Sequence, residues 1–581
     1  MAPPAVPWVG EDVQVDRLDG SCGGWSNGFV GRVRERLAES SRAFSVTARN
    51  PNLRRAQLAF GATWSAEWAF TVALAVVAFR DGGAAAVGIV GFARMVPAAL
   101  LSPFASALGD RFPRDQVLFW SCVIRAAATA AAALLLATGA PHIAVYSLAA
   151  LATVSFTVFR PAHSALLPGL CTTPFELMSA NVVRGLLDSL SMLVGPLVAA
   201  LLLGLGSPAT VFVVTAAFAL VAAALMLGLS YEAPPRVASQ PLRRIAQETL
   251  QGFRALRRYP DAGLLIGLGL AQTLTRGFLN VFVVVISFDL LEMGDPGVGL
   301  LTAAVGAGAV LGSLGASMFV SGRRLAALEG VGVALWGLPL TLCGALPFEP
   351  TVLALMCVIG VANALVDIGL YTLPARLVPE ALLTRVFGAK ESLTALSVAV
   401  GSLITPPAID LFGVRGALAV LGLAGPALAA LAWRRLLTID ASVRHRDEEI
   451  GVLQQVSMLR VLPVPAIDSL AVHVQHAKVD AGQDVFCQGD GGDRFYVISD
   501  GEADVIRDGR LICTIGPGEA FGEIALLRET TRTTTVHART SLNLYSLEGR
   551  DFLSAISGYS SSGREADSLI TARLGSFEAA H

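Results

Sequence analysis

Twelve apolar runs, each long enough to cross a lipid bilayer, occupy most of the sequence between residues 57 and 436. A transmembrane helix needs about 20 consecutive apolar residues. The 581-residue chain is 54% hydrophobic and 15% charged, outside the usual range for a water-soluble domain. The sequence therefore predicts an α-helical membrane protein embedded in a lipid bilayer. The expected spans are roughly 57–79, 84–108, 117–138, 141–163, 177–203, 208–230, 261–288, 297–319, 326–345, 351–373, 386–410 and 416–436.

The twelve runs form two sets of six, and a weak internal repeat supports two parallel halves. Leu166-Leu167-Pro168 matches Leu377-Val378-Pro379 at an offset of about 211 residues, and Pro196 falls opposite Pro406 at nearly the same offset. The pattern predicts twelve transmembrane helices in two six-helix halves.

Positive charge is unevenly distributed over the loops between the runs. If the N-terminus is cytoplasmic, most arginines near span ends face inward, whereas the outward loops hold only Arg80 and Arg415. Cytoplasmic loops carry the excess of positive charge in membrane proteins. We therefore expect a multi-pass protein of the cell membrane, inner or plasma, with both termini in the cytoplasm.

Other features of composition narrow the function further. The first 55 residues lack the apolar core of a cleavable signal peptide, and Asn27–Phe44 fits either a basic amphipathic helix on the inner membrane face or a disordered basic tail. A formal net charge of −2 gives no basic excess that would indicate nucleic acid as a partner. The seven cysteines are scattered, so neither a disulfide framework nor a metal site is predicted.

The segment Phe521–Leu527, together with Arg532, has the residue types of a phosphate-binding cradle. Gly518 and Gly522 allow tight turns, and Glu523–Leu527 is compatible with a helical turn whose unpaired amide groups face an anion. A cyclic phosphodiester carries one negative charge and two exocyclic oxygens that match a guanidinium fork. The segment therefore predicts a cyclic nucleotide site, in which Glu523 accepts a hydrogen bond from the ribose 2′-hydroxyl.

The surroundings of this cradle predict a β-roll, because short β-prone runs alternate with Gly and Asp turns. The runs are Gln475–Val479, Asp484–Gln488, Phe495–Ser499, Ala503–Arg507, Arg510–Ile515, Arg532–Ala538 and Leu542–Ser546. Residues 455–575 resemble the cyclic nucleotide-binding domain family. The resemblance rests on Ala481-Gly482, Gln488-Gly489-Asp490, Asp493–Ile498, Asp500-Gly501-Glu502, Gly516-Pro517-Gly518, Phe521–Leu527 and Arg532-Thr533.

This resemblance implies roles for individual residues. Arg532 is similar to the family's phosphate-binding arginine and Glu523 to its ribose-binding glutamate, while Gly522, Ile524 and Ala525 belong to the backbone that contacts ribose and phosphate. Thr533 lies beside the phosphate and also occurs in family members that favour cyclic GMP, so the ligand is cyclic AMP, which we favour, or cyclic GMP. The family has a helix that closes over the base, for which Arg564–Leu574 is the candidate. A ligand-free roll with Glu523 and Arg532 paired to each other is the alternative.

The apolar region, over about residues 55–437, resembles the major facilitator superfamily. Leu108-Gly109-Asp110-Arg111-Phe112-Pro113-Arg114 is similar to that family's cytoplasmic motif, with Gly109, Asp110, Arg111 and Arg114 as its conformational residues, although Ser106 and Pro113 replace two glycines. The chain further resembles the branch that contains enterobactin-exporter-like drug and siderophore efflux proteins. This resemblance rests on Phe159-Arg160-Pro161-Ala162, Leu167-Pro168, Ala180-Asn181 and Gly195-Pro196. Gly195-Pro196 resembles the antiporter motif, but Ser191 and Ala199 replace its flanking glycines.

Charged residues inside the spans are costly in hydrocarbon and so indicate function or pairing. Glu67 and Arg94 fall near mid-span in neighbouring helices, which predicts an ion pair or a proton-coupling site. For each of these residues a structural pair and a transport role remain open. The further transport candidates are Arg125, Arg276, Asp367 and the pair Arg184 and Asp188, which are spaced i, i+4 on one helix.

Together these features predict four segments: a cytoplasmic N-terminal segment 1–55, a transporter domain 56–437, a linker 438–457 and a cyclic nucleotide-binding domain 458–581. The expected function is secondary transport, by an exporter of a small amphiphilic compound that uses an ion gradient such as protons, regulated by cytoplasmic cyclic nucleotide. The alternative is a non-transporting membrane receptor or scaffold. No catalytic constellation or cofactor site is apparent, so an enzyme is not expected.

Overall fold

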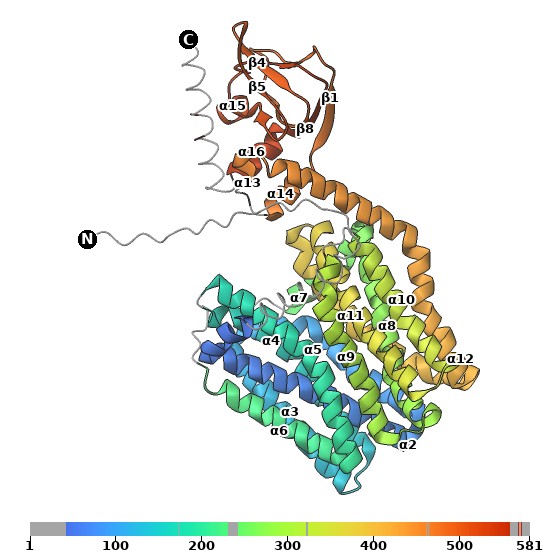
Figure 1. Cartoon of the computed structure of the whole chain (residues 1–581). Helices are drawn as coiled ribbons and strands as arrows, with labels where there is room; N and C mark the ends of the chain where they lie inside the picture. The colour runs from blue at the N-terminus through green and yellow to red at the C-terminus, as the bar shows by residue number, and fades with distance from the viewer. Residues whose placement is uncertain are drawn as a thin grey trace.

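The structure, a computed structural model, describes residues 42–171, 173–229, 242–320, 324–460, 462, 464–557, 568 and 571. Within its helices the side chains of 102–111, 174, 242–249, 316–320, 380–381, 464, 465 and 469 are not described. The predicted basic helix up to residue 41 and nearly all of the predicted lid helix Arg564–Leu574 lie outside these ranges. Figure 1 shows a helical domain joined by one long helix to a smaller β domain.

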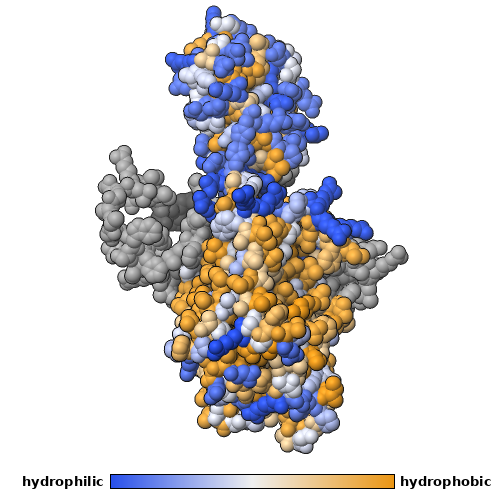
Figure 2. All heavy atoms as spheres, turned by 90° about the vertical axis from the view of Figure 1, so that its right-hand side faces the viewer, coloured by the Kyte–Doolittle hydropathy of each residue, from blue (hydrophilic) through white to orange (hydrophobic). Residues whose placement is uncertain are grey.

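Long helices, most of them apolar, make up the helical domain. They are α2 (Pro51–Arg111), α3 (Arg114–Ala137), α4 (His142–Leu170), α5 (Pro174–Leu205), α6 (Pro208–Met226), α7 (Leu242–Arg258), α8 (Pro260–Val285), the π-helical turn η1 (Ile286–Leu290), α9 (Gly294–Val320), α10 (Leu325–Ala345), α11 (Glu349–Leu377) and α12 (Glu380–Leu453). Within the described ranges, ten helices are long and apolar enough to cross a membrane. Figure 2 shows a broad apolar surface over this domain, as expected of a multi-pass membrane protein.

Two of the helices are interrupted by glycine. In α2 the break lies at Gly82 and Gly83, whose φ is +62°, and in α12 it lies at Gly413, with φ +68°. Only glycine adopts such positive φ values without strain. Both breaks coincide with boundaries between spans expected from the sequence. The second part of α12 then continues past the expected end of its span and forms the predicted linker as one unbroken helix to Leu453.

Glycines allow the first helices, α2–α6, to approach the later ones, α8–α12, closely. Helix α5 packs on α9, and α2 packs on α12. A Cβ atom at Gly306 would lie 2.2 Å from the carbonyl oxygen of Met192, and one at Gly299 would lie 2.7 Å from that of Pro196. Any side chain at these positions would force the helices apart.

The β domain consists of two four-stranded antiparallel sheets. One has the strand order β1-β8-β3-β6 and the other β2-β7-β4-β5. Short helices flank the sheets, and Phe495 stacks on Phe552 with ring centroids 4.3 Å apart in the core. The elements are α13 (Ser457–Arg460), α14 (Val464–Ala471), β1 (Gln475–Val479), β2 (Asp484–Phe486), β3 (Arg494–Asp500), β4 (Ala503–Arg507), β5 (Arg510–Ile515), β6 (Ala520–Phe521), α15 (Glu523–Leu527), β7 (Thr535–Ala538), β8 (Leu542–Glu548) and α16 (Gly549–Ser557).

The seven predicted strands are all present, with one notable shift. The run predicted to begin at Arg532 becomes a strand only at Thr535. The expected helical turn at Glu523–Leu527 is confirmed as α15. Strand β6 was not predicted, because two residues are too few to show a period.

Candidate functional sites

A tight turn between β6 and α15 shapes a pocket in the β domain. Gly522 precedes α15 with φ +89°. A Cβ atom there would lie 2.6 Å from Nη1 of Arg532 and 3.0 Å from the carbonyl oxygen of Arg494. A residue with a side chain would therefore both strain the backbone and displace the arginine.

Arg532 is the buried cation of this pocket. It is 3% exposed and donates hydrogen bonds to the carbonyl oxygens of Gly522 at 2.9 Å and Arg494 at 2.8 Å. Its guanidinium lies 4.2 Å from the ring centroid of Phe486. Burial lowers the pKa of Arg532, opposed by Tyr496 and nearby carboxylates. Its buried Nε has no hydrogen-bond partner within the described part of the chain.

The pocket collects the six nucleotide-binding residues predicted from the sequence. Its wall is formed by β-sheet residues and the turn around α15, and Glu523 is only 1% exposed. The predicted residues that line it are Gly522, Glu523, Ile524, Ala525, Arg532 and Thr533. The site thus places a cation and a carboxylate in one apolar concavity of a size suited to a small ligand.

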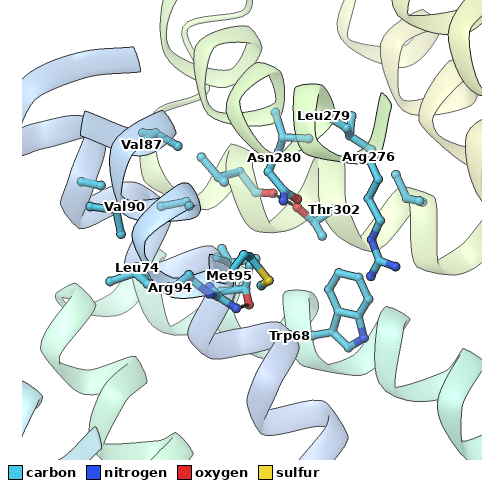
Figure 3. A pocket seen from close by; sticks show the side chains of 18 of the residues that line it. Trp68, Leu74, Val87, Val90, Arg94, Met95, Arg276, Leu279, Asn280 and Thr302 are labelled. Carbon is cyan, nitrogen blue, oxygen red and sulfur yellow. Dashed lines mark hydrogen bonds between the residues drawn. The ribbon is translucent and has the colours of Figure 1, made fainter. Parts of the chain in front are cut away.

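A second pocket lies between the two groups of transmembrane helices (Figure 3). It contains about 870 Å³ of empty space, part of which is open solvent. Arg94 enters from α2 and Arg276 from α8, and the Arg276 guanidinium lies 5.2 Å from the Trp68 ring centroid. Asn280 and Thr302 add polar groups to an otherwise apolar wall. No carboxylate lines this pocket among the residues that the structure describes.

Glu67 lies behind the Arg94 side of this pocket and contacts two arginines. Its Oε1 accepts a hydrogen bond from Arg94 at 2.7 Å, and its Oε2 lies 2.8 Å from Nη2 of Arg125 on α3. The second contact is an ion pair by distance, although its angle is not that of a hydrogen bond. Arg94 also donates to Thr71 at 3.1 Å. The sequence predicted a pair of Glu67 and Arg94, and the structure makes it a buried triad.

Known protein families match both parts of the chain. Residues 58–327 match the Major Facilitator Superfamily, and residues 476–559 match the cyclic nucleotide-binding domain. The chain combines a major facilitator domain with a cyclic nucleotide-binding domain.

Individual relatives resemble the cyclic nucleotide-binding domain. A cAMP-dependent protein kinase regulatory subunit of Schizosaccharomyces pombe is 35% identical over 127 residues, 22% of this chain and 31% of the relative. That of Yarrowia lipolytica is 34% identical over 119 residues, 20% of this chain and 32% of the relative. The chain thus spans about a third of the length of these relatives. The regulatory domain of Toxoplasma gondii PKA with cAMP is 27% identical over 19% of this chain and 44% of that chain, with a TM-score of 0.19.

The remaining transport candidates of the facilitator domain contact residues that the sequence did not single out as partners. Asp188 lies 3.7 Å from Arg160 on α4, and it also interacts electrostatically with Arg184, the partner predicted on the same helix. Arg184 donates a hydrogen bond to Ser164. The spacing i, i+4 permits a pair but does not exclude a partner on a facing helix. Asp367 accepts a hydrogen bond from Asn363 at 2.9 Å.

Two buried charged residues inside the expected spans of the facilitator domain were not predicted. Glu329 on α10 is 0% exposed, and within the described ranges neither of its carboxylate oxygens has a hydrogen-bond partner. Lys390 on α12 is 4% exposed and donates to the Tyr371 hydroxyl at 2.7 Å and to Glu391 at 3.0 Å. The rule that singled out Glu67 also applies to both, since each lies inside an apolar run.

The motif of the facilitator domain that is predicted to face the cytoplasm is only partly described. Arg114, the first residue of α3, donates a hydrogen bond to the carbonyl oxygen of Ala165 on α4 at 2.6 Å. The side chains of Asp110 and Arg111, and the surroundings of Gly109, lie outside the described part. Their role as conformational residues therefore stays a prediction.

Proposed function

We propose that the protein is a secondary transporter that exports a small amphiphilic compound and is regulated by cytoplasmic cyclic nucleotide, with cyclic AMP favoured. The observation that carries this proposal is the presence of two pockets of different chemistry on one chain. One lies between the transmembrane helices and the other beside Arg532. The relatives described as cAMP-dependent support cyclic AMP as the ligand.

The glycine breaks support a count of twelve spans in two halves. Dividing α2 and α12 at these breaks adds two spans to the ten long helices. On the side where the breaks lie, Arg80 pairs with Asp295, and Gly299 packs on α5. The halves are therefore in contact at this end, which is remote from the β domain because Val414–Leu453 is roughly 60 Å of helix.

The opposite end of the domain carries charged side chains from both halves. Arg160, on α4, interacts electrostatically with Tyr371, Glu391 and Asp367 from the later helices. Arg160 and Asp188 are half-exposed even though their helices are apolar. These residues favour an inward-open form with a water-filled entrance on the cytoplasmic side, which suits uptake of a cytoplasmic substrate for export.

The central pocket favours an amphiphile with an anionic head. Arg94 and Arg276 offer two cations, and the single carboxylate of Glu67 is shared by Arg94 and Arg125. An anion between Arg94 and Arg276 would offset the buried excess of positive charge. Trp68 and the apolar wall would hold the hydrophobic body. Among the described residues, Glu329 has no hydrogen-bond partner on either carboxylate oxygen and is a candidate for carrying a coupling proton, because a buried carboxylate without a partner is costly when ionised. Glu67 is the second candidate, and it would take up a proton only in a state in which its two arginines have moved away.

In the β domain, the proposed ligand places its phosphate on Arg532 and its ribose on Glu523. The buried Nε and the fixed orientation of the guanidinium match two exocyclic oxygens. Gly522, Ile524 and Ala525 would supply backbone contacts, and Thr533 would lie beside the phosphate. The charge bias of the loops puts this domain, and both termini, in the cytoplasm, where cyclic nucleotides are made.

Flux in proteoliposomes tests the proposal. When a proton gradient is imposed, purified protein should move a fluorescent naphthalenesulfonate in the direction opposite to the protons, and cyclic AMP added on the side of the β domain should change the rate. A membrane receptor or scaffold that does not transport would bind cyclic AMP without any flux. Binding of neither cyclic AMP nor cyclic GMP would refute the regulatory part.

A further inference from the structure

A cluster of two histidines and one glutamate joins α12 to the first β-sheet. His445 and Glu449 occur four residues apart on the part of α12 that has left the facilitator domain, and His476 lies on β1. Nε2 of His476 is 3.0 Å from Oε1 of Glu449, and Nε2 of His445 is 3.5 Å from the same oxygen. One ligand atom from each of the three residues lies within 4.8 Å of the others.

The surrounding structure holds these three side chains in place. Helical spacing puts His445 and Glu449 on one face of α12. Strand β1 is paired with β8, and the edge of the His476 ring contacts Tyr545 of β8 at a centroid distance of 4.7 Å. The two imidazole rings stack, with their centroids 5.2 Å apart and an interplanar angle of 21°. The Nε2 atoms of both rings lie near the same carboxylate oxygen. The Glu449 side chain is 10% exposed, whereas the histidines reach solvent.

The spacing matches the ligand set of a transition metal. Zinc binds histidine nitrogen and carboxylate oxygen at about 2.0–2.2 Å, which places neighbouring ligand atoms of a tetrahedral site about 3.3 Å apart. The two distances to Glu449 Oε1 bracket that value. Imidazole ligands select zinc and its neighbours over magnesium and calcium, which prefer oxygen. A carboxylate with two neutral imidazoles would also offset half of the charge of a divalent ion.

We propose that His445, Glu449 and His476 bind a zinc ion, or a transition metal of the same preference, with water in the fourth position. The metal would fix the last helix of the membrane domain to the sheet of the nucleotide-binding domain. It would therefore act on the connection through which the two domains communicate. The sequence did not reveal this site, because the third ligand is distant along the chain and on an element of another type.

The competing explanation for the cluster is an ion pair between Glu449 and a protonated histidine, with no metal. A measurement of zinc binding distinguishes these two explanations, because a protonated imidazole has no free lone pair for zinc. The full-length protein, purified through a tag that contains no histidine and stripped with a chelator, should bind zinc chloride with a stoichiometry of one in calorimetry. Cobalt(II) in place of zinc should give the visible absorption of a four- or five-coordinate site.

Substitution of each proposed metal-binding side chain then tests which residues form the site. Since loss of second-shell partners alone costs about 10–100-fold in metal affinity, His445→Ala, Glu449→Gln and His476→Ala should each weaken zinc binding by about tenfold or more. The matched control is His537→Ala, because His537 also pairs with a carboxylate, that of Asp484 at 2.7 Å, but on the other sheet. Its zinc affinity should equal that of the wild type.

Folding of the variants is checked independently of the metal. His445 is mostly exposed, so His445→Ala should melt like the wild type in the presence of chelator. Added zinc should raise the melting temperature of the wild type and of His537→Ala more than that of His445→Ala. Equal zinc binding by the wild type and a His445→Ala, His476→Ala double variant would overturn the proposal. So would the absence of one-to-one zinc binding by the wild type.

Discussion

At the scale of single residues, Arg532 is held by the carbonyl oxygens of Gly522 and Arg494, and its Nη2 lies 3.8 Å from the carboxylate of exposed Asp493. The cation is thus oriented by the fold before a ligand binds. A pocket of this kind needs little reorganisation when it binds phosphate.

Replacing this arginine should weaken binding of cyclic AMP. Hydrogen bonds to charged groups contribute about 1.5–3 kcal/mol, so Arg532→Ala should lower affinity about tenfold or more in calorimetry on the full chain. Arg539→Ala is the control, since Arg539 is exposed in the same domain and only 3.7 Å from Glu502. Arg532→Lys keeps a cation and separates loss of charge from loss of the two carbonyl contacts. Unchanged affinity in Arg532→Ala would remove this residue from the site.

The triad of Glu67, Arg94 and Arg125 gives an asymmetric prediction. Glu67→Gln leaves two buried arginines without a carboxylate, which should cost about 3–5 kcal/mol. Arg94→Gln leaves Glu67 paired with Arg125 and should cost no more than a charge-assisted hydrogen bond, about 1.5–3 kcal/mol. The melting temperature in detergent should therefore fall further in Glu67→Gln.

Arg125→Gln serves as the matched variant, because it leaves Glu67 paired with Arg94 and should be as mild as Arg94→Gln. Equal losses in Glu67→Gln and Arg94→Gln would indicate the two-residue pair expected from the sequence. A Glu67→Gln protein that melts like the wild type yet fails to move substrate against a gradient would instead identify Glu67 as the proton carrier.

At the scale of helices and strands, the sequence predicted what depends on local pattern. Apolar length located the spans and their boundaries, and turn residues located the strands of the β domain within a few residues. The pattern did not show which helices face each other, so Arg125 was not assigned to Glu67, and Asp188 was not assigned to Arg160. The pattern of a single sequence indicates which positions along each helix are buried. It does not indicate which residues of two helices meet, because that depends on how the helices pack.

The contact between α2 and α9 leads to a prediction about conformational change. Arg80, beside the break in α2, pairs with Asp295 in the first turn of α9. A partly exposed pair contributes up to about 1 kcal/mol, so Asp295→Asn should shift the equilibrium toward opening at this end by roughly fivefold. Spin labels at Leu205 and Phe348, which are exposed at the same end of the two halves, should report a longer distance.

The charge-swapped variant Arg80→Asp, Asp295→Arg controls for this change, since it restores the pair with opposite polarity. Its spin-label distances should return to those of the wild type. If Asp295→Asn leaves the distance distribution unchanged, the pair does not hold this end closed. A cysteine-depleted background is required, because described free cysteines such as Cys487 and Cys513 are exposed.

At the scale of the whole molecule, α12 belongs to two hydrophobic cores. Leu436, Ile439 and Val443 are buried in the core of the facilitator domain, while Leu453 is buried with Phe495 in that of the β domain. Because the helix between them is unbroken, a displacement of the β domain is transmitted to the last span as a rigid movement. A disordered linker would absorb such a movement.

Arg376, in the last turn of α11, contacts both α12 and α14 and so stabilises this connection. It pairs with Asp447 of α12, lies 3.9 Å from Asp468 of α14, and its carbonyl oxygen accepts a hydrogen bond from Arg446 at 3.1 Å. A ligand changes transport only to the extent that it stabilises one state of the transporter over another. Contacts that differ between states must therefore cross this junction.

We expect Arg376→Gln to uncouple the domains. Allosteric coupling typically amounts to about 1–3 kcal/mol, and loss of this charged junction should remove most of the effect of cyclic AMP on flux. Neither the affinity for cyclic AMP nor the flux without nucleotide should change, because Arg376 lines neither pocket. Arg435→Gln is the control, since Arg435 also joins α12 to a neighbouring helix through Asp261, at 2.7 Å, but before the connection begins. A full nucleotide response in Arg376→Gln would show that α12 alone transmits the signal.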